Sequence, residues 1–153
     1  MLRAAADHPG TSVVEIYQNC PVFNDGAFDA LTEKGAREDF VIRLEHGQPV
    51  RFGASGEHGV VRGSDGSLRI VDASGLDDSE LLVHDARCED PSLAFALSRL
   101  SSGPTQPTPV GVFRSVSRPV WGSGVVGDAG AGDRDADAEL EALLHSGDMW
   151  TVA

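Results

Sequence analysis

The sequence predicts an α/β fragment followed by a small α+β extension. Residues 12–17 (SVVEIY) are apolar at both parities except at Glu15, which is typical of a buried strand in a parallel sheet. The later strand-like segments are short, bounded by glycine and arranged like a meander. A parallel strand needs a parallel neighbour, and no other segment looks like one. The chain is therefore expected to be a fragment, or a subunit that completes the sheet of another polypeptide.

The first half of the chain alternates helix and strand signals. Residues 1–7 are alanine-rich and predict a helix that ends at His8-Pro9-Gly10. After the strand at 12–17, Asn24 and Asp25 are expected to cap a helix over residues 26–34. Strands are expected at residues 40–44, 50–52, 59–63 and 67–71, and a turn with a further strand at 77–83.

The second half begins with a clear helix signal. Residues 91–100 (PSLAFALSRL) place Pro91 in the first turn and form one apolar face from Leu93, Ala94, Leu97 and Leu100. A proline-rich connector is expected at residues 103–109 and a last strand at 110–116. Residues 121–138 are rich in glycine and aspartate and predict disorder, and residues 139–145 predict a short amphipathic helix.

Composition excludes several classes of function. The 153 residues carry 12 Lys and Arg against 24 Asp and Glu, a net charge of −12, which argues against binding nucleic acid. No apolar run is long enough to span a membrane, and the N-terminus does not resemble a signal peptide, so a cytoplasmic location is expected. Cys20 and Cys88 are then expected to be free thiols or ligands.

Cys20 is the main candidate for chemistry. It follows the strand at 12–17 and precedes Pro21, and ligands of open α/β sheets lie at the carboxyl ends of the strands. A thiolate there can be a nucleophile, a metal ligand or an inert buried group. A nucleophile needs a base, and His46 and His84 are the available histidines. One cysteine cannot hold a metal centre alone, so the other ligands would come from elsewhere.

The remaining candidates have simple structural explanations. Glu45 and His46 form an acid–base pair at a strand end, or a solvated turn. His84-Asp85 is either an oriented imidazole or another turn. Cys88 lies in a polar stretch and reads as an incidental thiol. The glycines of residues 53–66 do not follow a strand and open a helix, so they do not predict a phosphate loop.

A family resemblance adds to this interpretation. The motifs EIYQNCPVFNDGAFD, LEHGQPVRFG, LLVHD, LAFALSRL and PVGVFRSV occur in this order between residues 13 and 116, and LLHSGDMWTV closes the chain. Together they resemble the C-terminal part of the β subunit of 2-oxoacid:ferredoxin oxidoreductases, most closely the 2-oxoglutarate type. The resemblance implies that residues 1–35 end a thiamine-diphosphate-binding domain. It implies that residues 36–120 form the C-terminal domain of a β subunit, followed by a flexible linker at 121–138 and a terminal helix and tail at 139–153.

The resemblance also implies cofactors. In that family the complete β subunit binds thiamine diphosphate and Mg²⁺ through a GDGD motif, and it holds a four-iron, four-sulfur cluster. Three cluster cysteines lie near the N-terminus of that subunit, and the fourth follows the last strand of the thiamine fold, often just before a proline. Cys20 matches this fourth position. The resemblance places no catalytic residue and no thiamine ligand in this chain.

This sequence departs from the family pattern, since it contains neither GDGD nor an N-terminal Cys-x-x-Cys. The isolated chain is therefore expected to be inactive and to bind no cofactor. The expected partners are the remainder of the β subunit, the α subunit and ferredoxin, with no nucleic acid and no membrane. The expected activity of the complex is the CoA-dependent oxidative decarboxylation of a 2-oxoacid. The alternative is a non-catalytic module that packs against another subunit.

Overall fold

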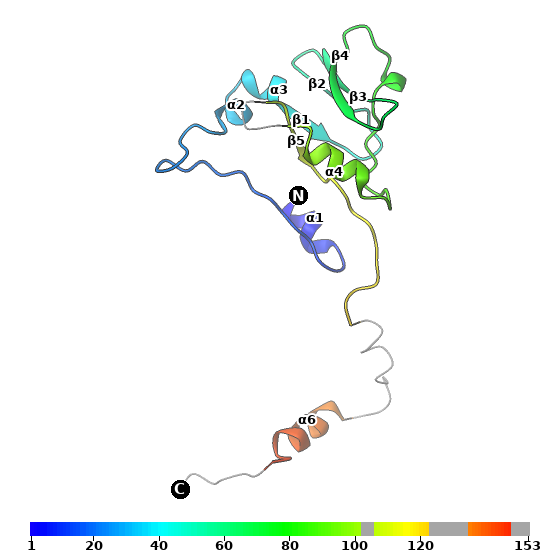
Figure 1. Ribbon diagram of the computed structural model, residues 1–153. Coiled ribbons are helices and arrows are strands. Elements are labelled where there is room, and N and C mark those ends of the chain that lie inside the picture. The colour runs from blue at the N-terminus through cyan, green and yellow to red at the C-terminus, as the bar shows by residue number, and fades with distance from the viewer. Residues whose placement is uncertain (102–105, 123–134, 148–153) are drawn as a thin grey trace. The chain divides into compact units, whose positions relative to one another are not determined.

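A computed structural model of the chain describes residues 1–101, 106–122 and 135–147, except the side chain of residue 136. The chain divides into two compact units, Met1–Arg118 and Pro119–Ala153. The elements of the first unit, in chain order, are α1 (Leu2–Asp7), α2 (Asp29–Thr32), α3 (Ala36–Phe40), β1 (Val41–Leu44), β2 (Arg51–Phe52), β3 (His58–Arg62), β4 (Leu68–Asp72), the 3₁₀ turn η1 (Asp78–Glu80), α4 (Ser92–Ser98) and β5 (Thr108–Gly111) (Figure 1). The second unit contains α6 (Ala136–Leu144).

The strands form two sheets. β1 and β5 pair in parallel, with Val41 opposite Thr108 and Leu44 opposite Gly111. β2, β3 and β4 form an antiparallel sheet in that order, which is the predicted meander. The mixed α/β class is thus confirmed, with both parallel and antiparallel pairing. The parallel pair was not predicted, because β1 was expected to belong to the meander and β5 was expected to start only at residue 110.

A small apolar core joins the two sheets to α4. Its fully or nearly buried members are Ile42, Leu44, Val50, Phe52, Val60 and Leu97. Leu97 belongs to the predicted apolar face of α4, and Leu93 and Leu100 pack against the same cluster. Alternation along β1 buries Ile42 and Leu44 and exposes Arg43, as period-two geometry requires. The core therefore holds residues 41–111 together and leaves the first 35 residues outside it.

A partly buried guanidinium group supports the antiparallel sheet. Arg51 Nη1 donates to the carbonyl oxygens of Gly56 and Ala73, at 2.8 and 2.9 Å. Its Nη2 donates to the Leu76 carbonyl oxygen at 2.8 Å, and its Nε donates to Asp78 Oδ1 at 3.0 Å. Hydrogen bonds from a charged donor are among the stronger ones, so Arg51 ties the segment before β3 to the segment after β4, at one end of this antiparallel pair.

The strand predicted at residues 12–17 is wrong for this chain. These residues form no strand, and the side chains of Val13 and Ile16 are 93% and 70% exposed. The run has strand-forming residues but no neighbouring strand within the described part of the chain, and an unpaired strand does not hold its geometry alone.

Several boundaries also differ from the prediction. The helix expected at residues 26–34 is only α2, and its N-terminus has no side-chain cap, so the capping role given to Asn24 and Asp25 is wrong. α3 was not predicted. The strand expected at 110–116 ends at Gly111, and residues 108–109, expected in a connector, belong to β5. The remainder of that connector includes residues 102–105, which lie outside the described residues.

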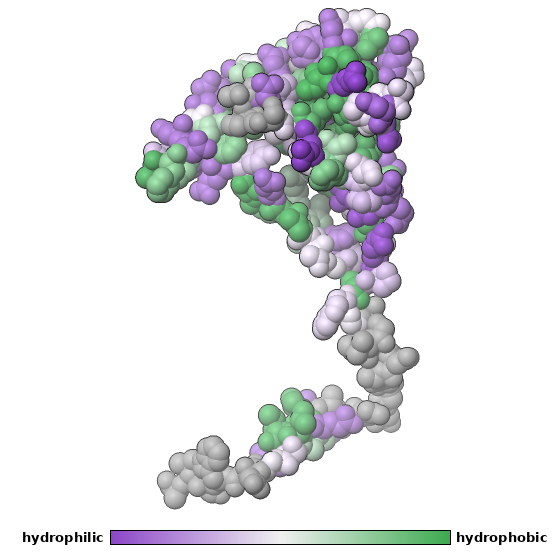
Figure 2. Space-filling model, in the orientation of Figure 1, coloured by the Kyte–Doolittle hydropathy of each residue, from purple (hydrophilic) through white to green (hydrophobic). Residues whose placement is uncertain are grey.

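The second unit contains a short helix with exposed leucines. α6 begins at Ala136, with Asp135 Oδ1 accepting a hydrogen bond from the Ala138 backbone N–H, so the disorder predicted through residue 138 is wrong for its last residues. Residues 123–134 of that stretch lie outside the described part. Leu140, Leu143 and Leu144 are exposed, and Figure 2 shows apolar surface on this helix. None of the helices in the described residues has the length and apolar content needed to cross a bilayer.

Candidate functional site

Cys20 lies at the start of a tight loop, here called the Cys20 loop, that spans residues 19–26. The Asn24 backbone N–H donates to the Cys20 carbonyl oxygen at 2.8 Å, and these two residues form an isolated antiparallel bridge. Pro21 follows Cys20 directly, and its fixed φ suits the first corner of such a turn. The loop thereby places a half-buried thiol at a defined point, as the predicted strand end was expected to do.

Asn19 closes the Cys20 loop from the other side. Its Oδ1 accepts a hydrogen bond from the Gly26 backbone N–H, and its Nδ2 donates to Asp25 Oδ1, both at 2.9 Å. Gly26 has φ +71, a conformation that side chains rarely adopt. Asn19 was not singled out from the sequence, and Asp25 serves this closure instead of capping a helix. An Asn next to a Cys-Pro corner is the turn signal that could have indicated it.

The loop backbone favours the thiolate form of Cys20. The backbone N–H groups of Phe23, Val22 and Asn24 lower the pKa of the Cys20 thiol, with Phe23 the largest cause, and partial burial opposes them. Hydrogen bonds to the charged form of a group favour that form. A lowered pKa makes the thiolate easier to form, and the thiolate is the form of cysteine that acts as a ligand or a nucleophile.

The tip of the loop is apolar and exposed. Val22 and Phe23 are 80% and 90% exposed, although their backbone N–H groups face the Cys20 sulfur. At the base of the loop the rings of Tyr17 and Phe28 stack on each other. The Cys20 loop therefore holds its thiol between an aromatic base and an apolar tip.

The two histidine motifs come together, but not at Cys20. His46 Nδ1 lies 3.4 Å from Asp85 Oδ1, and both side chains are about half exposed. His84 is fully buried, and its Nε2 lies 2.9 Å from the Val112 carbonyl oxygen. Neither histidine is hydrogen-bonded to Cys20 in the described structure, so the geometry gives Cys20 no general base. The structure supports the turn interpretation of His46 and a structural role for His84.

Cys88 occupies a loop that is tied to the chain after β5. Its backbone carbonyl accepts a hydrogen bond from Arg114 Nε at 3.3 Å, and its neighbour Glu89 accepts from Arg114 Nη2 at 2.8 Å. Both contacts involve backbone carbonyl oxygens and leave the Cys88 thiol unused. The interpretation of Cys88 as an incidental thiol stays a prediction.

Within the described residues, Cys20 is not part of a complete metal site. No group of three or more His, Cys, Asp and Glu side chains is arranged to hold a metal ion in residues 1–101, 106–122 and 135–147. A four-iron, four-sulfur cluster takes four thiolates. A thiol whose pKa is lowered by backbone N–H donors, as that of Cys20 is, is chemically suited to one of these four positions. The other three thiolates would have to come from another part of the protein or from a partner.

Comparison with known proteins supports the family assignment. The chain is 46% identical to the 2-oxoglutarate oxidoreductase subunit KorB of Mycobacterium tuberculosis over 99% of its own length. The predicted resemblance to a 2-oxoglutarate oxidoreductase subunit is confirmed. The chain spans 41% of the length of KorB, which is consistent with a C-terminal part of such a protein. No family model matches the chain, and no solved structure matches it.

Proposed function

We propose that this chain is part of the β subunit of a 2-oxoglutarate:ferredoxin oxidoreductase. The complete enzyme would carry out the CoA-dependent oxidative decarboxylation of 2-oxoglutarate and pass the electrons to ferredoxin. The observation that carries this proposal is the 46% identity to KorB over nearly the whole chain. The partners would be the remainder of the β subunit, the α subunit and ferredoxin, and the location would be cytoplasmic.

In this proposal Cys20 is one ligand of a four-iron, four-sulfur cluster, and thiamine diphosphate and Mg²⁺ are held outside this chain. The cluster, when bound, supplies one-electron transfer. The support comes from the Cys20 loop, since the N–H groups of Val22, Phe23 and Asn24 favour the thiolate. Metal binding needs a deprotonated sulfur, so a lowered thiol pKa reduces the competition from protons.

The other residues of the loop position this sulfur. Asn19 ties the two legs of the loop together through Gly26 and Asp25, so the backbone that carries Cys20 is held closed. Hydrogen bonds to a ligand sulfur also tune the reduction potential of an iron–sulfur cluster that this sulfur binds. Val22 and Phe23 present apolar surface next to the thiol, which would exclude water from it once a partner covers the tip.

A non-catalytic role in holding subunits together is the second candidate. The exposed apolar side chains of residues 12–17 favour it, because a contiguous apolar surface on a small protein marks an interaction site. The two candidates differ in what the assembled complex does without this chain.

The test is reconstitution of the complex. This chain is co-expressed with the part of KorB that it does not match and with an α subunit, and the purified complex is supplied with 2-oxoglutarate, CoA and ferredoxin under anaerobic conditions. Ferredoxin reduction that depends on both 2-oxoglutarate and this chain is expected, and the chain alone should show none. An assembled complex that reduces ferredoxin equally well without this chain would favour the non-catalytic role.

A further inference from the structure

Residues 12–17 have the composition of a strand but no strand partner within the described part of the chain. The run contains the β-branched residues Val13, Val14 and Ile16, and it forms no helix, strand or turn, with Val13 and Ile16 largely exposed. No backbone–backbone hydrogen bond joins residues 11–18 to the described part of the chain. Backbone N–H and C=O groups must be paired when the apolar side chains beside them become buried. The segment therefore offers both of its edges for pairing.

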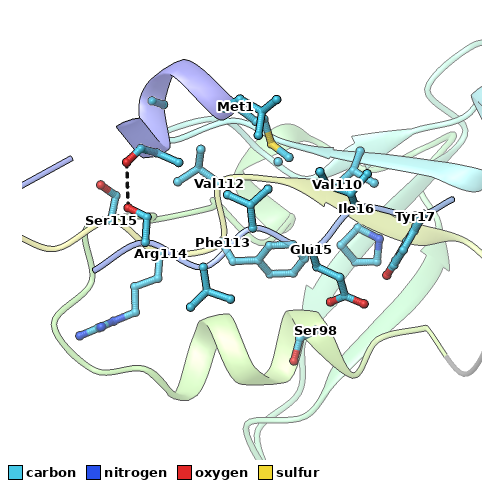
Figure 3. A pocket seen from close by; sticks show the side chains of 18 of the residues that line it. Met1, Glu15, Ile16, Tyr17, Ser98, Val110, Val112, Phe113, Arg114 and Ser115 are labelled. Carbon is cyan, nitrogen blue, oxygen red and sulfur yellow. Dashed lines mark hydrogen bonds between the residues drawn. The ribbon is translucent and has the colours of Figure 1, made fainter. Parts of the chain in front are cut away.

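A large apolar groove lies beside this segment. It has a volume of about 1050 Å³ and runs between the N-terminal residues 1–17 and the chain from Thr108 to Ser115. Figure 3 shows the side chains that line it, among them Met1, Ile16, Tyr17, Val110, Val112 and Phe113. A groove of this size and character would be filled by apolar side chains of another element.

β5 itself is a poor template for an added strand. It pairs with β1 on one edge, and within the described residues its other edge has no neighbour. Pro109 lies in its middle, and proline has no N–H to donate to a ladder. The backbone available for pairing is therefore that of residues 12–17, and β5 and the residues after it supply a wall of side chains.

The comparison with KorB points to the occupant. This chain corresponds to 41% of KorB, so more than half of that protein's length has no counterpart here. A helix laid in the groove would leave the backbone of residues 12–17 unpaired, whereas an extended strand would satisfy it and bury its side chains at the same time.

We propose that residues 12–17 form a β-strand with an extended, aliphatic strand of the polypeptide that corresponds to the rest of KorB, and that apolar side chains of this partner fill the groove against Val110, Val112 and Phe113. The inference rests on the proposed function for the identity of the partner. Pairing would order residues 12–17 directly before the Cys20 loop. The same contact would therefore bring Cys20 to the partner.

The test is co-purification. This chain, carrying an affinity tag, is co-expressed with the unmatched part of KorB, and the amount of partner retained is measured without added iron. The wild-type chain is expected to retain one partner chain for each copy of itself. Ile16→Asp should reduce retention about 10-fold or more, because it places a charge in a dry contact. Leu143→Asp, at a side chain that is also 70% exposed, should leave retention unchanged.

Backbone pairing is tested by a pair of proline variants. Neighbouring residues of a strand direct their N–H groups to opposite edges, so Val13→Pro and Val14→Pro remove donors from different edges. At least one of them should reduce retention about 10-fold, while Val13→Ala and Val14→Ala retain the partner within about 3-fold. Melting temperatures should not change, because these residues lie outside the core.

Several results would overturn the proposal. One is a wild-type chain that retains no partner, and another is a chain that self-associates through residues 12–17 in place of binding the partner. A third is Ile16→Asp and both proline variants retaining as much partner as the wild type. The last is Leu143→Asp losing as much partner as Ile16→Asp. Cys20→Ser should bind the partner normally, since Cys20 does not line the groove. Retention of the partner without 2-oxoglutarate-dependent activity supports this surface and counts against the proposed function.

Discussion

The rings of Tyr17 and Phe28 stack with their centroids 5.0 Å apart and their planes 4° from parallel. The two residues come from opposite sides of the Cys20 loop, so the stack closes the base of the loop. Burial raises the pKa of the Tyr17 hydroxyl, with the nearby Glu15 carboxylate as a second cause. The aromatic contact and the Asn19 hydrogen bonds together hold the position of Cys20.

Loss of the stack should loosen the loop. Aromatic pairs contribute about 0.5–1.5 kcal/mol beyond their buried area, so Tyr17→Ala should speed hydrogen exchange at the Asn24 amide by roughly 2- to 12-fold. Tyr17→Phe keeps the ring and should exchange like the wild type. The measurement is amide hydrogen exchange by NMR. An Asn24 amide that exchanges at the same rate in all three proteins would show that the stack does not hold the loop.

The pH dependence of the Cys20 thiol should reflect its N–H donors. Because the loop lowers the thiol pKa below its ordinary value, alkylation of Cys20 in a Cys88→Ser background should have its midpoint at lower pH in the folded chain than in denaturant. The donors stabilise the loop at pH values above the ordinary thiol pKa. That stabilisation is lost as the pH falls through the lowered pKa.

A matched pair of variants assigns this effect to the backbone. Phe23→Pro removes the N–H group that is the largest cause of the lowered pKa of Cys20, whereas Phe23→Ala keeps it. The alkylation midpoint should rise in Phe23→Pro and stay unchanged in Phe23→Ala. If the two variants shift the midpoint equally, the Phe23 ring and not its N–H group controls the thiol.

The parallel β1–β5 pair should depend on Gly111. Its φ is +141, and a Cβ placed there would lie 2.6 Å from the Leu44 carbonyl oxygen. Gly111→Ala should therefore lower the free energy of unfolding by about 1–3 kcal/mol or more, from backbone strain and the clash with β1. Gly75→Ala is the control, since a Cβ there meets no atom within 4 Å. Urea unfolding compares the two, and equal stabilities would mean that β1 and β5 are not packed as described.

The histidines should separate into a structural and a surface residue. His84→Leu removes the hydrogen bond between the fully buried His84 ring and the Val112 carbonyl oxygen and should cost about 0.5–1.5 kcal/mol of unfolding free energy. His46→Leu removes only an exposed pair with Asp85, which is typically worth about 0–1 kcal/mol. Urea unfolding of both variants checks this. A larger loss from His46→Leu would contradict the assignment.

Local patterns predicted the local elements. The meander of β2, β3 and β4 follows from short apolar runs between glycines, and α4 follows from Pro91 and its spaced leucines, because both depend on contacts between neighbours in the sequence. The β1–β5 pairing joins distant segments and has no local signal. Pro109 argued against a strand, although an edge strand tolerates it.

The strand predicted at residues 12–17 shows a different limit. β-Branched residues such as Val13, Val14 and Ile16 favour a pleated, packed surface, but they do not supply the neighbouring strand that creates one. At the candidate site, the position of Cys20 and its Pro21 corner were visible in the sequence. The roles of Asn19, Tyr17 and Phe28 depend on how the loop closes, so they became visible only in three dimensions.

The most direct test of the account is the iron and sulfide content of the reconstituted complex. Cys20→Ser and Cys88→Ser variants are each assembled with the unmatched part of KorB and an α subunit, and iron, sulfide and visible absorbance are measured. Serine oxygen is a harder and poorer ligand for iron than a thiolate. The account predicts reduced cluster retention and ferredoxin reduction in Cys20→Ser and wild-type values in Cys88→Ser. Full cluster occupancy in Cys20→Ser, or damage in Cys88→Ser alone, would contradict it.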